Sequence, residues 1–169
     1  MITGELKSKV DRLWETFWSN GISNPLSVIE QVSYLLFIKQ LDDKELAKEK
    51  KAQRLKRPVK SPTFSPENQD CRWSHFKNID DPQVMLETVR DRAFPFIKQL
   101  GSNDTESDYT RYMKDAVFLI TSPALLSTAV QQIDQMLSDL EQQAKADQDS
   151  NYVDLMGDLY EYCNWSLVL

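Results

Sequence analysis

The sequence predicts an all-α fold, a compact domain of about six to eight helices with no significant sheet. Only four of its 169 residues are glycine, and the alternating apolar-polar runs that half-buried strands require are scarce. Apolar residues instead recur at three- and four-residue intervals, as expected for helices with one buried face. With 41% apolar residues, a chain of this length can bury a core of its own in a single domain.

The first two helices are predicted on either side of Asn20-Gly21, because glycine accepts the left-handed conformation that ends a helix. Asn24-Pro25 begins the second helix, with asparagine as the N-cap and proline at the first helical position. We expect this helix to continue through a charged stretch to about Arg57. The first helix carries one apolar stripe: Leu6, Val10, Leu13, Trp14 and Phe17.

The middle of the chain alternates between loops and helices. Residues 58–70 hold three prolines and few apolar residues, which predicts an extended loop. Asp81-Pro82 repeats the signal of a cap followed by proline and begins the next helix. Pro95 is expected to break or kink that helix, and Gly101 to end it.

The last third contains the clearest helix, which begins at Ser122-Pro123. Before it, residues 109–120 predict a short helix or, less favoured, a strand at their apolar end. After it, residues 142–151 form a polar connector and residues 152–162 a last helix. The helix from Ser122 has one broad apolar face: Leu125, Leu126, Ala129, Val130, Ile133, Met136, Leu137 and Leu140.

No catalytic, metal or cofactor site is predicted. His75 is the only histidine, so we expect a packed or capping residue rather than a ligand or a member of a triad. Cys71 and Cys163 lie far apart without a CxxC motif, as in buried or idle thiols of a reducing cytoplasm. No glycine-rich phosphate loop is present, and no run approaches the roughly 18 apolar residues of a membrane span. These features predict a soluble cytoplasmic chain that is not an enzyme by itself.

One charge run departs from the overall balance. The chain has 20 lysines and arginines against 26 acidic residues, a net charge of -6, which gives no general attraction to nucleic acid. Between residues 48 and 60 seven basic residues face one acid, so this run is a candidate for DNA phosphate contacts. An equally weighted alternative is a solvated helix end whose lysines complement the helix dipole. The seven candidates are Lys48, Lys50, Lys51, Arg54, Lys56, Arg57 and Lys60.

Several stretches resemble, in order and spacing, the helical N-terminal domain of the modification subunits of type I restriction-modification systems. They are LWETFWSN (13–20), YLLFIKQLDD (34–43), RWSHFKN (72–78), RDRAFPFIKQLG (90–101), YMKDAVFLI (112–120) and GDLYEY (157–162). Each is modest alone, since amphipathic segments such as LLFIKQL are common. Together they are spread over nearly the whole chain, from residue 13 to residue 162, and their order and spacing make the resemblance specific.

The resemblance implies a parent enzyme whose second domain binds S-adenosylmethionine and methylates adenine N6 in DNA. Such a domain carries a [DN]-P-P-[FY] loop, which is absent here, since the only Asn-Pro is the N-cap Asn24-Pro25. The sequence therefore predicts a non-catalytic chain without a cofactor of its own. Residues 1–163 would form the helical domain, and residues 164–169 a truncated connection to the catalytic domain, either natural or trimmed at the boundary. Candidate interface residues near this connection are Tyr160, Tyr162, Trp165 and Leu167, where exposed apolar surface would favour dimers or aggregates.

The leading functional prediction is an assembly and DNA-clamping domain. The resemblance implies as partners DNA, the specificity subunit, a second modification subunit and the restriction subunit. The alternative is a free-standing helical interaction module without a DNA role, which would bind a protein through its last helix or through the Leu125–Leu140 face. An independent enzyme is the least favoured reading.

Overall fold

The computed structural model describes residues 4–103, 113 and 115–146. Within these ranges the chain contains helices and connecting segments and no strand, which confirms the all-α prediction. None of the described helices combines the length and apolarity needed to cross a membrane. The elements are α1 (Gly4–Ser19), α2 (Pro25–Arg54), the 3-10 helix η1 (Pro66–Cys71), α3 (Trp73–Phe76), α4 (Pro82–Thr88), the π-helical turn η2 (Val89–Ala93), α5 (Phe94–Asn103) and α7 (Pro123–Ala146).

The junction between α1 and α2 follows the local signals. Gly21 has a φ of 94°, a value that glycine adopts without the steric cost of a Cβ. Asn24 caps α2, since its side-chain oxygen accepts a hydrogen bond from the Leu26 N–H at 3.0 Å. This helix ends at Arg54 rather than Arg57, and its 30 residues make it the longest described element.

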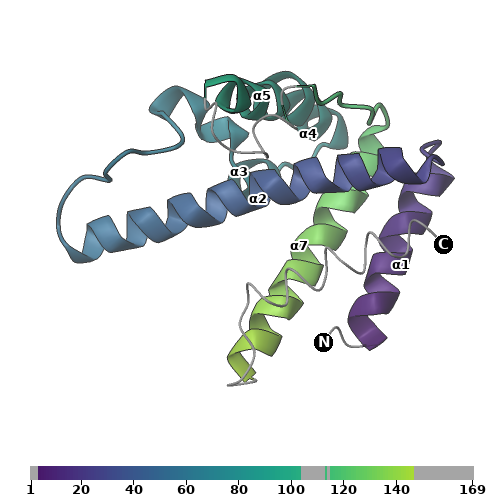
Figure 1. Cartoon of the computed structure of the whole chain (residues 1–169), viewed down its shortest axis with the longest axis horizontal. Helices are drawn as coiled ribbons and strands as arrows, with labels where there is room; N and C mark the ends of the chain where they lie inside the picture. Colours follow the sequence, from purple (N-terminus) through teal and green to yellow (C-terminus); the bar gives the residue numbers. More distant parts are fainter. Residues whose placement is uncertain (1–3, 104–112, 114, 147–169) are drawn as a thin grey trace.

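The core forms where α7 packs against α1 and α4 (Figure 1). The predicted face of α7, Leu125 to Leu140, is buried in this core. It is therefore not available to a partner protein, which corrects one surface suggested for the interaction-module alternative. Lys9 of α1 and Asp139 of α7 form an ion pair beside the core. The largest fully buried side chains include Phe17, Leu35, Ile38, Trp73, Phe76, Met85, Ile97 and Ile133.

The segment from α4 to α5 is helical but irregular. Asp81 caps α4, accepting the Gln83 N–H at 2.9 Å. The predicted irregularity near Pro95 is the π turn η2, where the Phe94 N–H bonds to the carbonyl of Val89, five residues earlier. Gly101 does not end the helix as predicted, because α5 continues through Asn103.

Residues 116–120 are an irregular segment and not a strand. The buried Gln31 side chain holds them against α2, donating to the Val117 carbonyl and accepting from the Leu119 N–H, both at 3.0 Å. The side-chain amide of Gln31 thus makes the two backbone hydrogen bonds that a neighbouring strand would otherwise make with this segment. Most of the predicted short helix before this segment lies outside the described residues.

α7 begins and extends as its sequence indicates, with one difference. Ser122 caps it through a bond from the Leu125 N–H to the Ser122 hydroxyl oxygen, 3.2 Å long. The helix continues to Ala146, so the first part of the predicted connector, residues 142–151, is helical. The predicted last helix at 152–162 lies outside the described residues.

Candidate nucleic-acid interface

The predicted basic run lies at the far end of α2. Figure 1 shows this end of the helix extending away from the other helices, with the chain returning beside it toward α3. We call residues 48–60 the basic arm and residues 61–74, which return to the body, the strap. Six of the seven predicted basic residues on the arm are exposed: Lys50, Lys51, Arg54, Lys56, Arg57 and Lys60.

The tip of the arm is a tight helix-ending turn. The Lys56 N–H bonds to the Gln53 carbonyl at 3.2 Å, and the Arg57 N–H to the Ala52 carbonyl at 3.0 Å. These two bonds form a Schellman motif, whose left-handed residue is usually glycine. Here that residue is Lys56, with a φ of 50°. The backbone therefore holds a lysine in a conformation that L-residues disfavour.

Glu45 fastens the strap to α2. Its side chain is buried, and its two carboxylate oxygens accept the N–H groups of Thr63, at 3.2 Å, and Phe64, at 2.7 Å. Lys48 strengthens the attachment, because its ammonium donates to the Ser61 carbonyl at 3.0 Å and to the Thr63 hydroxyl at 3.2 Å. Lys48 thus differs from the other candidates on the arm, since its charge already has partners.

Arg72 forms a second attachment at the base of the strap. Its guanidinium donates to Asp42 at 2.6 Å and to Glu49 at 2.5 Å. The other Asp42 oxygen accepts the Ser74 N–H at 2.8 Å, and Gln69 accepts a further guanidinium N–H at 3.1 Å. The hydrogen bond to Glu49 raises the pKa of Arg72, and the bond to Asp42 adds to this rise. The buried Asp42 carboxylate is therefore paired and hydrogen-bonded, as a buried charge must be.

On the outer part of α2 the acidic side chains have partners, and most of the basic side chains do not. Each acid between residues 42 and 49 has a partner: Asp42 and Glu49 bind Arg72, Glu45 binds the strap, and Asp43 pairs with Lys39 at 2.5 Å. In contrast, none of the six exposed cations on the arm forms an ion pair within the described part of the chain. The arm is thus strongly positive in a chain whose net charge is -6.

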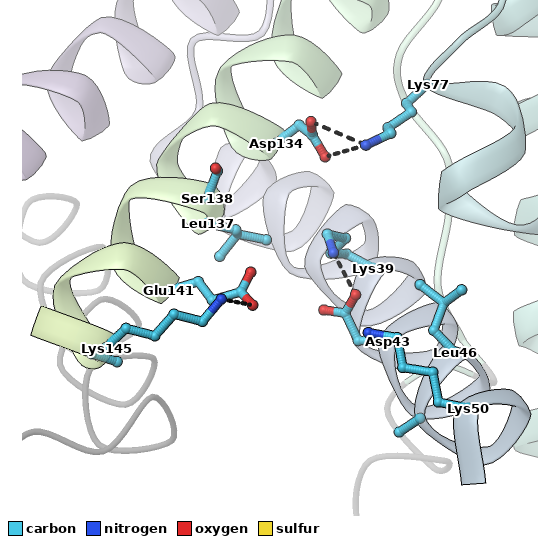
Figure 2. A pocket seen from close by; sticks show the side chains of 12 residues that line it. Lys39, Asp43, Leu46, Lys50, Lys77, Asp134, Leu137, Ser138, Glu141 and Lys145 are labelled. Carbon is cyan, nitrogen blue, oxygen red and sulfur yellow. Dashed lines mark hydrogen bonds and ion pairs between the residues drawn. The ribbon is translucent and has the colours of Figure 1, made fainter. Parts of the chain in front are cut away.

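A groove of about 720 Å³ lies between α2 and α7 (Figure 2). Three ion pairs line it: Lys39–Asp43, Lys77–Asp134 at 3.4 Å and Lys145–Glu141 at 3.3 Å. Leu46 and Leu137 contribute apolar surface between them. Because most of its charges are paired, the groove is a weaker candidate for an anionic ligand than the arm.

His75 and Cys71, the two described side chains considered as metal ligands or catalytic groups, lie on the surface and in the core, respectively. The prediction for His75 was a packed or capping residue. His75 is exposed and its neighbours Trp73 and Phe76 fill the core, so the packed alternative is wrong. The caps of α3 are Arg72 and Lys77. Cys71 is buried, and this burial, with the Asp70 charge beside it, raises the pKa of its thiol to about 12. The described residues contain no cluster of three or more potential metal ligands. Cys163 and the predicted interface residues Tyr160, Tyr162, Trp165 and Leu167 lie outside the described residues.

The acids of α2 that face the strap, of which Asp42 and Glu45 are buried, are the part of this site that was not predicted. Asp42, Glu45, Glu49 and Ala52 recur at intervals of three and four, so they share one face of the helix. Carboxylates scattered along a charged helix are ordinarily solvated. No sequence signal marks this face as covered, because the alanine in its row is buried whereas Ala47, in the same charged run, is exposed.

Comparison with known proteins assigns the chain to a family. Residues 6–133 match the family model described as the HsdM N-terminal domain. No curated protein and no solved structure matches the chain significantly. The matched residues include every stretch on which the predicted resemblance rests except GDLYEY at 157–162. Because the match covers well over half of the chain, this protein belongs to the family of HsdM N-terminal domains, the N-terminal part of the modification subunit of type I restriction-modification systems.

Proposed function

We propose that this domain binds DNA phosphates through its basic arm and so helps the modification subunit to enclose DNA. The observation that carries the proposal is the sorting of charges on α2. The four acids of α2 between residues 42 and 49 all have partners, in the strap or, for Asp43, on α2 itself, whereas six cations of the arm remain exposed and without ion pairs among the described residues. An exposed group of lysines and arginines on a projecting element fits the phosphate backbone of a duplex.

The backbone at the tip supports the same proposal. Lys56 occupies a left-handed position that glycine would fill at lower cost. A residue in a disfavoured conformation is consistent with a functional requirement for its side chain. At this position the side chain adds a positive charge to the outermost turn of the arm.

Binding of this kind is expected to be independent of sequence and steeply dependent on salt. Each phosphate neutralised releases condensed counterions, so the slope of log K against log salt is about -0.9 per contact. Six cations set an upper limit of roughly -5 for this slope. The net charge of -6 opposes binding elsewhere on the chain, so the isolated domain should bind weakly.

Fluorescence anisotropy of a labelled duplex, titrated with the 169-residue chain at several salt concentrations, tests the proposal. Replacing Lys50, Lys51, Arg54 and Arg57 by Gln should reduce both the affinity and the salt slope. The control makes the same change in net charge by replacing four exposed cations outside the arm, Arg12, Lys44, Arg90 and Lys145, by Gln; Arg90 and Lys145 are ion-paired. If both quadruple variants lose binding equally, overall charge and not the arm is responsible, and the assignment of the arm is wrong.

We further propose that the domain transfers no methyl group by itself and that S-adenosylmethionine binds elsewhere in the parent enzyme. The absence of a [DN]-P-P-[FY] loop from the sequence supports this. Incubation of the chain with labelled S-adenosylmethionine and duplex DNA should give no labelled DNA, with a complete modification enzyme as the positive control. Turnover above the no-enzyme background would contradict the proposal.

The second part of the proposed role is assembly in the cytoplasm with the other subunits of a type I system. Membership of the family supports this role. Size-exclusion chromatography of the chain mixed with a specificity subunit, or with a second modification subunit, should show a shift to a larger complex. A complex without any duplex binding would instead favour the alternative of a protein interaction module.

A further inference from the structure

We propose that the strap is a clamp that sets the geometry of the DNA surface and that Glu45 is its positioning residue. This inference rests on the proposed function of the arm. Glu45 does not belong to the exposed basic surface. It acts through the strap, by fixing the path of the chain where it returns from the tip.

The contacts of Glu45 are those of a clamp. One buried carboxylate accepts two consecutive backbone N–H groups, at 3.2 Å from Thr63 and 2.7 Å from Phe64. The phenyl ring of Phe64 is buried beside this contact, with the Arg72 guanidinium 5.7 Å from its centre. Without the carboxylate, the strap loses the acceptor for two N–H groups that lie partly or fully away from solvent.

The clamp acts on the cations through the short chain between them. Lys60 immediately precedes Ser61, whose carbonyl accepts the Lys48 ammonium and whose φ is 51°. Only a few residues separate this fixed point from Lys56 and Arg57 at the tip. Cations held in place bind phosphates with less loss of conformational entropy than cations on a free loop. The clamp therefore joins the helix and the returning chain into one preorganised surface.

Replacement of Glu45 should change the DNA affinity in the direction opposite to the one expected from charge alone. Removing a negative charge next to a basic surface should tighten DNA binding, because one repulsive charge is lost. If Glu45 is a positioning residue, its replacement should weaken binding, because Lys60 and the tip lose their fixed geometry. The direction of the change thus separates the two explanations.

The test uses the 169-residue chain, a fluorescein-labelled duplex and anisotropy over a series of salt concentrations. Glu45→Gln keeps the shape of the side chain and should weaken binding at least threefold, with a salt slope smaller by about one contact. Asp80→Asn, which removes the same charge from an exposed site, should leave binding unchanged or slightly tighter. Hydrogen exchange should show faster exchange at the Thr63 and Phe64 amides in Glu45→Gln alone.

Two outcomes would overturn the inference while leaving the proposed function intact. The first is binding by Glu45→Gln that is as tight as, or tighter than, that of the wild type with an unchanged slope. The second is protection of the Thr63 and Phe64 amides that does not depend on Glu45. Failure of the wild type to bind the duplex in a salt-dependent way would instead refute the proposed function. Circular dichroism establishes that the variant folds, and Glu45→Asp, which keeps the charge, should recover part of the lost affinity.

Discussion

Replacing Lys56 by glycine should make this protein more stable and weaken the DNA binding that we propose for the arm. Lys56 has a φ of 50° at the end of α2, and the left-handed conformation costs an L-residue about 1–2 kcal/mol. Glycine avoids this cost but loses about 0.5–1 kcal/mol through its greater freedom in the unfolded chain. The expected net gain is about 0.5–1 kcal/mol. For a chain of this size the melting temperature should rise by about 1–4 °C.

Thermal unfolding followed by circular dichroism measures the gain, and anisotropy with a labelled duplex measures the loss of one phosphate contact. Two controls separate the turn from general effects. Lys51→Gly, in the last turn of α2, should lose up to about 1 kcal/mol because glycine is a poor helix former. Lys56→Ala keeps the Cβ, so it should show no comparable gain. If Lys56→Gly melts at or below the wild-type temperature, while Lys51→Gly behaves as expected, the turn is not strained and the reasoning fails.

Three further predictions concern the strap and its surroundings. Trp73→Phe removes the indole N–H that donates to Asp134 at 2.8 Å, so urea unfolding should show a loss of about 1.5–3 kcal/mol; no loss would mean that this bond is not stabilising. Hydrogen bonds from Arg92 hold the pKa of the Asp70 carboxyl below its usual value of 3.8. This pair therefore stabilises the fold fully above that pH and less as the pH falls through the lowered folded pKa. Acid unfolding should begin at a higher pH in Arg92→Gln; an identical acid limb would contradict the assignment. Burial raises the pKa of the Cys71 thiol to about 12, so iodoacetamide at neutral pH should modify it only after urea unfolding, as read by peptide mass spectrometry; modification of the folded chain would show that the thiol is accessible.

The starts of α2 and α4 and the buried face of α7 could be predicted from the sequence, because each depends on neighbouring residues. Asn24 and Asp81, each followed by proline, begin helices because a cap needs only its own side chain and an N–H two residues later. The apolar face of α7 was equally readable, since a helix repeats its buried positions every three or four residues. The end of α5 was not: Gly101 lies inside the helix, because glycine permits a helix end without requiring one.

The strap could not be predicted because its contacts join residues far apart in the sequence. Arg72 is 30 positions from Asp42, and Phe64 is 19 positions from Glu45. A buried carboxylate on a charged helix looks like a solvated one until its partner is known. Phosphate contacts and a solvated helix end both require exposed side chains on the basic arm, and of the seven predicted residues only Lys48 is not exposed. Its involvement in the strap depends on the same long-range contacts.

In the outer half of α2, paired charges rather than apolar side chains determine which face of the helix is buried. An ordinary amphipathic helix buries an apolar face against the core, and that face fixes its orientation. In the outer half of α2, Asp42 and Glu45 are buried instead, held by Arg72 and by the backbone of the strap. A rotation of the helix would leave these buried carboxylates without partners. Loss of the partner of a buried charge is strongly destabilising. The orientation that satisfies the acids is therefore also the one that leaves Lys51 and Arg54 exposed. The same contacts that fasten the strap thus determine that the exposed side of the arm is positively charged.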